Sequence, residues 1–95
     1  MKRRFFFPVL LLSLMVGNNV SLADFQKGRD AFSREDYATA LKEWKPLAEK
    51  GDAEAQNGLG VIYDHGRGVP QDHKTAIKWF TLAAKQGYAK AQSNL

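Results

Sequence analysis

The chain has 95 residues, of which 14 are basic and 10 acidic, and it contains two histidines and no cysteine. Without cysteine it has no disulfide and no thiolate chemistry, and two histidines without ligands at metal spacing do not predict a zinc site. Its basic residues are spread among acidic ones, which does not predict the clustered basic face of a nucleic-acid-binding domain. We therefore expect one small domain that binds no nucleic acid and needs no cofactor or metal.

The beginning of the chain predicts a signal peptide over residues 1–23. A basic start at residues 2–4 precedes an apolar run at residues 5–16, and Ser21 and Ala23 supply the small residues of a cleavage site. The apolar run is shorter than the roughly 20 residues of a membrane-spanning helix, so we expect no stable membrane insertion after cleavage. The expected product is an exported protein, either periplasmic or secreted. Three of the 14 basic residues leave with the leader, so 11 basic residues face 10 acidic ones in the remainder.

The rest of the chain predicts helices throughout, because its apolar residues recur at helical spacing without any alternating strand pattern. We expect helices over residues 25–32, 37–50, 53–65 and 73–86, and the start of another from residue 89. Asp36, Asp52 and Asp72 stand at N-cap positions, where a carboxylate accepts hydrogen bonds from free backbone N–H groups. Gly51 and Gly87 stand where a helix ends in the left-handed conformation.

Three residues are unusual inside these helices. Gly58 and Gly60 each cost about 1 kcal/mol relative to alanine, which predicts that a neighbouring backbone approaches closely there. Pro46 removes a backbone hydrogen bond to Lys42, so we expect a kink or a broken last turn. Core positions are predicted for the aromatic residues at helical spacing, which are Trp44, Tyr63, Trp79 and Phe80.

Two stretches of the chain match in register 36 residues apart. Residues 52–56 correspond to residues 88–92, with two alanines and a glutamine identical. Further matched pairs are Ala40 with Ala76, Leu41 with Ile77, Trp44 with Phe80, Ala48 with Ala84, Gly51 with Gly87 and Leu59 with Leu95. A fixed period of about 20–50 residues is typical of repeat proteins, in which neighbouring units bury each other's apolar faces. The sequence thus predicts an all-α repeat fold.

Residues 53–88 also carry a longer pattern, formed by Ala55, Leu59, Gly60, Tyr63, Gly66, Gly68, Val69, Asp72, Ala76, Trp79, Phe80, Ala83, Ala84 and Gly87. This pattern resembles the Sel-one-like repeat of the tetratricopeptide-like family, which implies a right-handed α-solenoid of antiparallel helix pairs. The preceding part resembles a degenerate first repeat whose loop is about four residues shorter. After the signal peptide we therefore expect one repeat domain over residues 24–95. It comprises the degenerate repeat at 24–52, the full repeat at 53–88 and the start of a further repeat at 89–95.

The resemblance implies an adaptor or scaffold that binds a protein or peptide, and bacterial relatives are often exported. A subset connected with β-lactam binding or hydrolysis has two cysteines per repeat, which this chain lacks. In such arrays the first helix of each pair lines the concave side. The partner-binding residues implied by this geometry are Glu54, Asn57, Val61, Asp64, His65, Lys90 and Ser93, with Phe25, Gln26 and Arg29 as a beginning of the groove. The alternative is that these residues are simply solvated.

The nearest approach to a catalytic set is formed by Asp64, His65, Asp72 and His73. No nucleophile is spaced to accompany them, so we expect a helix cap and solvated side chains rather than catalysis. A hydrolase active on cell-wall material or β-lactams stays the alternative. A truncated, non-functional fragment is another, because the helix from residue 89 stops before the Gly and Tyr positions of its counterpart. Its open C-terminal end also leaves self-association as an option.

Overall fold

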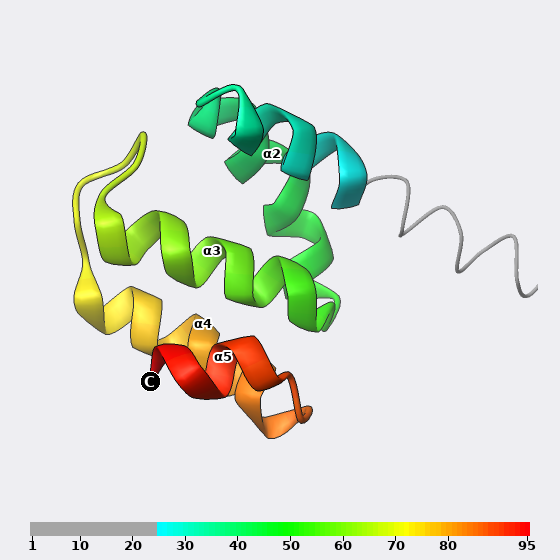
Figure 1. The fold of residues 1–95 in the computed structure, drawn as a ribbon, viewed down its shortest axis with the longest axis vertical. Helices are drawn as coiled ribbons and strands as arrows, with labels where there is room; N and C mark the ends of the chain where they lie inside the picture. Colours follow the sequence, from blue (N-terminus) through cyan, green and yellow to red (C-terminus); the bar gives the residue numbers. More distant parts are fainter. Residues whose placement is uncertain (1–24) are drawn as a thin grey trace, which may run out of the picture.

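The computed structural model describes residues 25–95, which form helices joined by short turns and one longer loop (Figure 1). A helix over residues 25–33 is followed by α2 (Tyr37–Glu49), α3 (Ala53–His65), α4 (His73–Lys85) and α5 (Ala89–Asn94). These described residues contain no strand, so the predicted all-α class is confirmed. In the same part of the chain, no helix has the length and apolar character needed to cross a membrane. The predicted signal peptide lies outside the described residues.

Carboxylates begin three of the helices. Asp36, Asp52 and Asp72 each accept a hydrogen bond from the backbone N–H three residues later, over 3.3, 3.0 and 3.2 Å respectively. Each bond satisfies an N–H group that has no partner inside its own helix. The three predicted N-caps are therefore confirmed, and α2, α3 and α4 begin where the sequence indicates.

Gly51 and Gly87 form the same turn in successive parts of the repeat. Their φ angles are 103° and 84°, in the left-handed region that glycine adopts without the strain of a Cβ atom. The N–H of Gly51 donates to the carbonyl of Ala48 over 3.0 Å, and that of Gly87 donates to the carbonyl of Ala84 over 2.9 Å. Both predicted helix stops are confirmed.

Pro46 does not break α2, which continues to Glu49. The neighbouring side chains of Leu47 and Ala48 are 5% and 2% exposed and belong to the core, whereas Pro46 is exposed. Burial of these two residues holds the last turn in place despite the missing backbone hydrogen bond. The alternative of a broken last turn is therefore wrong, and the alternative of a kink stays a prediction.

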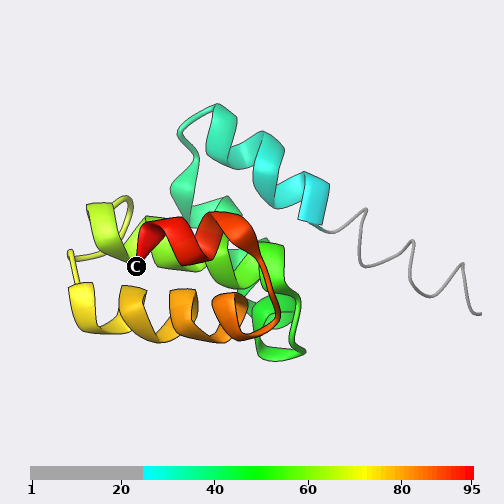
Figure 2. The same cartoon turned by 60° about the horizontal axis from the view of Figure 1, so that its bottom comes forward.

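The helices pack as successive neighbours, with α3 against both α2 and α4, and α5 along α4 (Figures 1 and 2). A first core cluster joins the helix at residues 25–33 to α2 and α3. Its buried members are Phe25, Ala31, Ala40, Trp44, Leu47, Ala48, Ala55, Leu59 and Ile62. A second cluster joins α4 and α5 through Ala76, Phe80, Ala83 and Ala91. Each helix pair thus completes its core with the helix that follows, as expected of stacked repeats.

The helical glycines make room for two aromatic rings. A Cβ atom at Gly60 would lie closer than 3.0 Å to the ring of Phe80, and one at Gly58 or Gly28 would lie equally close to the indole of Trp44. The predicted close approach is therefore real, but it is made by side chains, and the expectation of a neighbouring backbone is wrong. Trp44 and Phe80 are matched positions of the repeat, so the packing of an aromatic ring against a helical glycine occurs in both units.

The aromatic residues divide between core and surface. Trp44 and Phe80 are 5% and 3% exposed, which confirms their core positions. The indole of Trp44 stacks on Phe25 with ring centroids 5.4 Å apart, and its Nε1–H donates to the backbone carbonyl of Phe25 over 3.0 Å. Tyr63 and Trp79 are partly buried and pack at the edge of the core, Tyr63 against the second cluster and Trp79 against the first, so their predicted role in core packing is confirmed. Both side chains also line a pocket.

Candidate functional site

The predicted partner-binding residues lie on two helices. Those on α3 are Glu54, Asn57, Val61, Asp64 and His65, and those on α5 are Lys90 and Ser93. Four of them are partly buried: Glu54, Asn57, Val61 and Asp64. They share one face of α3 because they stand three or four residues apart, as the helical turn requires. His65, Lys90 and Ser93 are exposed. Phe25 is buried against Trp44, so the expectation that it begins this surface is wrong.

Asn57 links the two helices that carry these residues. Its Oδ1 accepts a hydrogen bond from Nδ2 of Asn94 over 3.0 Å, which joins α3 to α5. Asn94 was not singled out by the sequence, since the two residues stand 37 positions apart and so are not matched by the 36-residue period. The bond makes the surfaces of α3 and α5 continuous at this point.

Tyr88 adds a phenol to the same region. Burial raises the pKa of Tyr88, and the negative charges of Glu54 and Asp52 raise it further, while the positive charge of Arg29 opposes them. The charge of Glu54, one of the predicted partner-binding residues, therefore acts on this phenol. The only signal in the sequence was the place of Tyr88 itself, at the position that Asp52 occupies one period earlier.

Three of the predicted residues also support the fold. Val61 packs against the second core cluster. Oδ1 of Asp64 lies 2.8 Å from Nδ1 of His73, which joins the end of α3 to the start of α4. Nδ1 of His65 lies 3.1 Å from the carbonyl of Val61 in its own helix. Substitution of Asp64 would therefore change helix packing as well as any partner contact.

The residues nearest to a catalytic set are only partly brought together. His73 pairs with Asp64, and their side chains are 65% and 39% exposed, so water reaches both. Asp72 caps α4, and the hydroxyl of Thr75 also donates to it over 2.7 Å. Within residues 25–95 no group of three or more His, Asp and Glu side chains could hold a metal ion. What this arrangement provides is a link between two helices.

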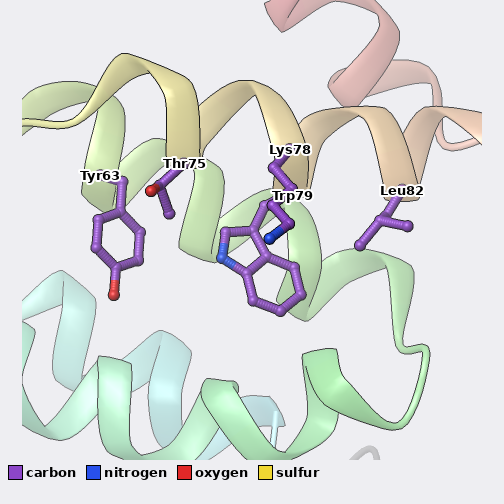
Figure 3. Close-up of a pocket in the computed structure, with 5 residues that line it drawn as sticks. All are labelled: Tyr63, Thr75, Lys78, Trp79 and Leu82. Atoms are coloured by element: carbon purple, nitrogen blue, oxygen red, sulfur yellow. The ribbon is translucent and has the colours of Figure 1, made fainter.

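A pocket of about 280 Å³ lies at the junction of α3 and α4. It is lined by Tyr63, Thr75, Lys78, Trp79 and Leu82, whose side chains project toward the side of the molecule that holds α2 (Figure 3). Trp79 is partly buried and packs against the first core cluster, whereas Lys78 is exposed and Leu82 is 40% exposed. None of these five residues belongs to the predicted partner-binding surface. Thr75, Lys78, Trp79 and Leu82 stand three or four residues apart or adjacent and so share one face of α4, whereas the sequence predicted a core position for Tyr63 and Trp79 and no pocket.

Comparison with known proteins agrees with this fold. Residues 53–88 match the Sel1 repeat family, which confirms the predicted resemblance for that part of the chain. Together with the helix packing, the match defines an all-helical, tetratricopeptide-like repeat fold.

Three similar proteins come from distant organisms. Chitin synthase regulatory factor 3 of Schizosaccharomyces pombe is 44% identical over 46 residues, or 48% of this chain and 5% of the relative. Putative sel1-like repeat-containing protein L21 of Acanthamoeba polyphaga mimivirus is 41% identical over 51 residues, which are 54% of this chain and 10% of the relative. An F-box protein of Arabidopsis thaliana is 40% identical over 85 residues, which are 90% of this chain and 23% of the relative. The chain therefore spans less than a quarter of the length of each relative, and the similarity indicates the repeat and its general role in protein–protein interaction.

Proposed function

We propose that the chain is an exported helical-repeat module that binds a protein or peptide partner as an adaptor or scaffold. The observation that carries the proposal is the link between Asn57 and Asn94, which makes one surface of α3 and α5. This surface presents Lys90 and Ser93 at one side and Glu54 at the other, a mixture of polar groups suited to a peptide chain. The similar proteins support the proposal, since one is named as a regulatory factor and another as an F-box protein.

The same proposal assigns no catalytic role to Asp64 and His73. Their contact joins α3 to α4, and its exposure to water gives neither group the sheltered setting in which acid–base catalysis is efficient. We expect no hydrolysis of β-lactams or of cell-wall peptides by the purified chain. Turnover that is lost on Asp64→Asn, with an unchanged circular dichroism spectrum, would contradict this assignment.

The partner-binding proposal is tested by crosslinking tagged protein in its native host and identifying captured proteins by mass spectrometry. The best variant is Lys90→Glu combined with Ser93→Arg, because both side chains are exposed and take no part in the core. We expect one recurrent partner with the unchanged chain, and its loss with the double variant. The matched control is Lys50→Glu, which reverses an exposed lysine at the end of α2. Capture that the double variant leaves unchanged would contradict the surface assignment.

Export is tested separately, by N-terminal sequencing of the protein expressed in a bacterium. We expect the protein outside the cytoplasm to begin at Asp24, because cleavage follows the small residues Ser21 and Ala23. Protein that stays in the cytoplasm with Met1 at its N-terminus would contradict the proposal of export, without bearing on partner binding.

A further inference from the structure

The charges of the chain are distributed unevenly. All 10 acidic residues stand between Asp24 and Asp72, whereas residues 73–95 contain four lysines and no acidic residue. Three of these lysines, at positions 74, 78 and 85, are exposed on α4. The expectation that basic and acidic residues are interspersed is therefore wrong for the last part of the chain. A surface with one sign of charge attracts partners of the opposite sign.

The pocket described above lies beside these lysines. Lys78 is one of its lining residues, and Tyr63, Trp79 and Leu82 supply aromatic and aliphatic surface next to that charge. Leu82 is a large aliphatic side chain that is 40% exposed, so much of its apolar surface still faces water. Burying such surface in a contact is favourable because it removes apolar area from water. The pocket thus combines one cation with the exposed apolar surface of Leu82 and the partly exposed rings of Tyr63 and Trp79.

The size of the pocket indicates the kind of group that fits it. Its volume of about 280 Å³ is close to the lower end of the range for small-molecule sites, roughly 300–1,000 Å³. A bulky apolar side chain of a peptide fits a shallow site of this kind better than a complete cofactor does. Tyrosine and tryptophan are also among the side chains that contribute most at protein–protein contacts.

We propose that this pocket and the lysines of α4 form a second docking surface, which binds an acidic peptide segment by taking in one of its bulky apolar side chains. The apolar side chain lies between Tyr63, Trp79 and Leu82, and acidic residues of the peptide face the exposed lysines. Asp72 accepts a hydrogen bond from Thr75 at one edge of the pocket, so the acidic residues extend from Lys78 toward Lys85 instead. This surface shares no residue with the proposed partner-binding surface of α3 and α5.

The test measures binding of a synthetic peptide, Glu-Glu-Leu-Phe-Glu-Glu, to the purified chain by isothermal titration calorimetry. We expect saturable binding that weakens as salt is added, because exposed charges are screened. Leu82→Ser and Lys78→Glu should each raise the Kd at least about fivefold. Matched controls are Ile77→Ser, at an aliphatic residue of α4 that is 55% exposed and does not line the pocket, and Lys50→Glu. Both controls should change the Kd by less than about twofold.

Several outcomes would overturn the proposal. One is a control peptide that binds as tightly as Glu-Glu-Leu-Phe-Glu-Glu although it has lysines in place of the glutamates, or alanines in place of Leu-Phe. Another is tighter binding of an oligothymidine strand, which would assign the surface to nucleic acid. A third is the absence of peptide binding by folded protein. If Leu82→Ser unfolds the chain, Lys78→Glu decides alone, because Lys78 is exposed. The Lys90→Glu and Ser93→Arg double variant should bind the peptide normally, which separates this proposal from the adaptor surface.

Discussion

Gln56 and Gln92 make the same contact at matched positions of the repeat. Nε2 of Gln56 donates to the carbonyl of Ala48 over 3.1 Å, and Nε2 of Gln92 donates to that of Ala84 over 3.3 Å. Gln56 is also 4% exposed, and its Oε1 accepts a hydrogen bond from Gln86 over 3.0 Å. The buried amide of Gln56 is paired at both ends, so it holds this turn against the helix before it, and removing it takes away two hydrogen bonds.

We expect Gln56→Leu to lower the free energy of unfolding by about 1–3 kcal/mol, because two hydrogen bonds of a buried amide, to Ala48 and from Gln86, are lost. Urea denaturation followed by circular dichroism measures this change. The matched control is Gln92→Leu, since Gln92 is exposed and water can replace its contact. Equal losses for the two variants would contradict a role for burial.

The two exposed N-cap carboxylates predict a dependence of stability on pH. Hydrogen bonds from Thr39 lower the pKa of Asp36, and hydrogen bonds from Thr75 lower the pKa of Asp72, both from the ordinary value of 3.8. The pKa of each carboxyl group is lower in the folded state than in the unfolded state. The stability that the two carboxylates contribute is therefore complete at a pH above their pKa in the unfolded chain. This contribution is lost as the pH falls through the pKa of each carboxyl group in the folded state. We expect the midpoint of thermal unfolding to decrease as the pH is lowered below about 4, and to decrease less in Asp72→Asn. An unchanged pH profile for that variant would contradict the prediction.

At the scale of helices, the contact between ring and glycine sets how closely neighbours pack. Gly60→Ala places a Cβ atom against the buried ring of Phe80, so we expect a net loss of stability of about 1–2 kcal/mol despite the better helix propensity of alanine. In a Phe80→Leu background, where the ring is absent, the same substitution should be neutral or stabilising. Thermal unfolding of the four proteins of this cycle measures the coupling. Additive effects would mean that the ring does not limit the substitution.

Local signals in the sequence predicted the helices well. The carboxylates at 36, 52 and 72 and the glycines at 51 and 87 act within a few residues of themselves, so their positions alone indicated where helices begin and end. The continuation of α2 through Pro46 was not predictable in this way, because it depends on burial against other helices. The pairing of Asn57 with Asn94 and the pocket beside Trp79 likewise depend on how helices distant in the sequence pack together.

At the scale of the whole molecule, α3 connects two core clusters and α5 completes the second. Ending the chain after Gly87 removes Tyr88 and Ala91 from that cluster and uncovers Phe80. In a stacked array a unit depends on its neighbour, so we expect a lower unfolding midpoint and faster amide hydrogen exchange in α4 than in α2. The control is removal of Leu95 alone, which is 60% exposed and should change little. Equal exchange in α2 and α4 of the shortened chain would show that the two clusters unfold as one.

The two tryptophans of the chain occupy different surroundings, which gives the protein two optical reporters. Trp44 is 5% exposed and stacks on the rings of Phe25 and Phe32, whereas Trp79 is partly exposed in the pocket. Emission from Trp44 therefore follows the integrity of the core, and emission from Trp79 follows the polarity of the pocket. Replacing either one with phenylalanine leaves the other as a single intrinsic fluorophore. Folding and pocket occupancy can then be watched separately, without an attached dye.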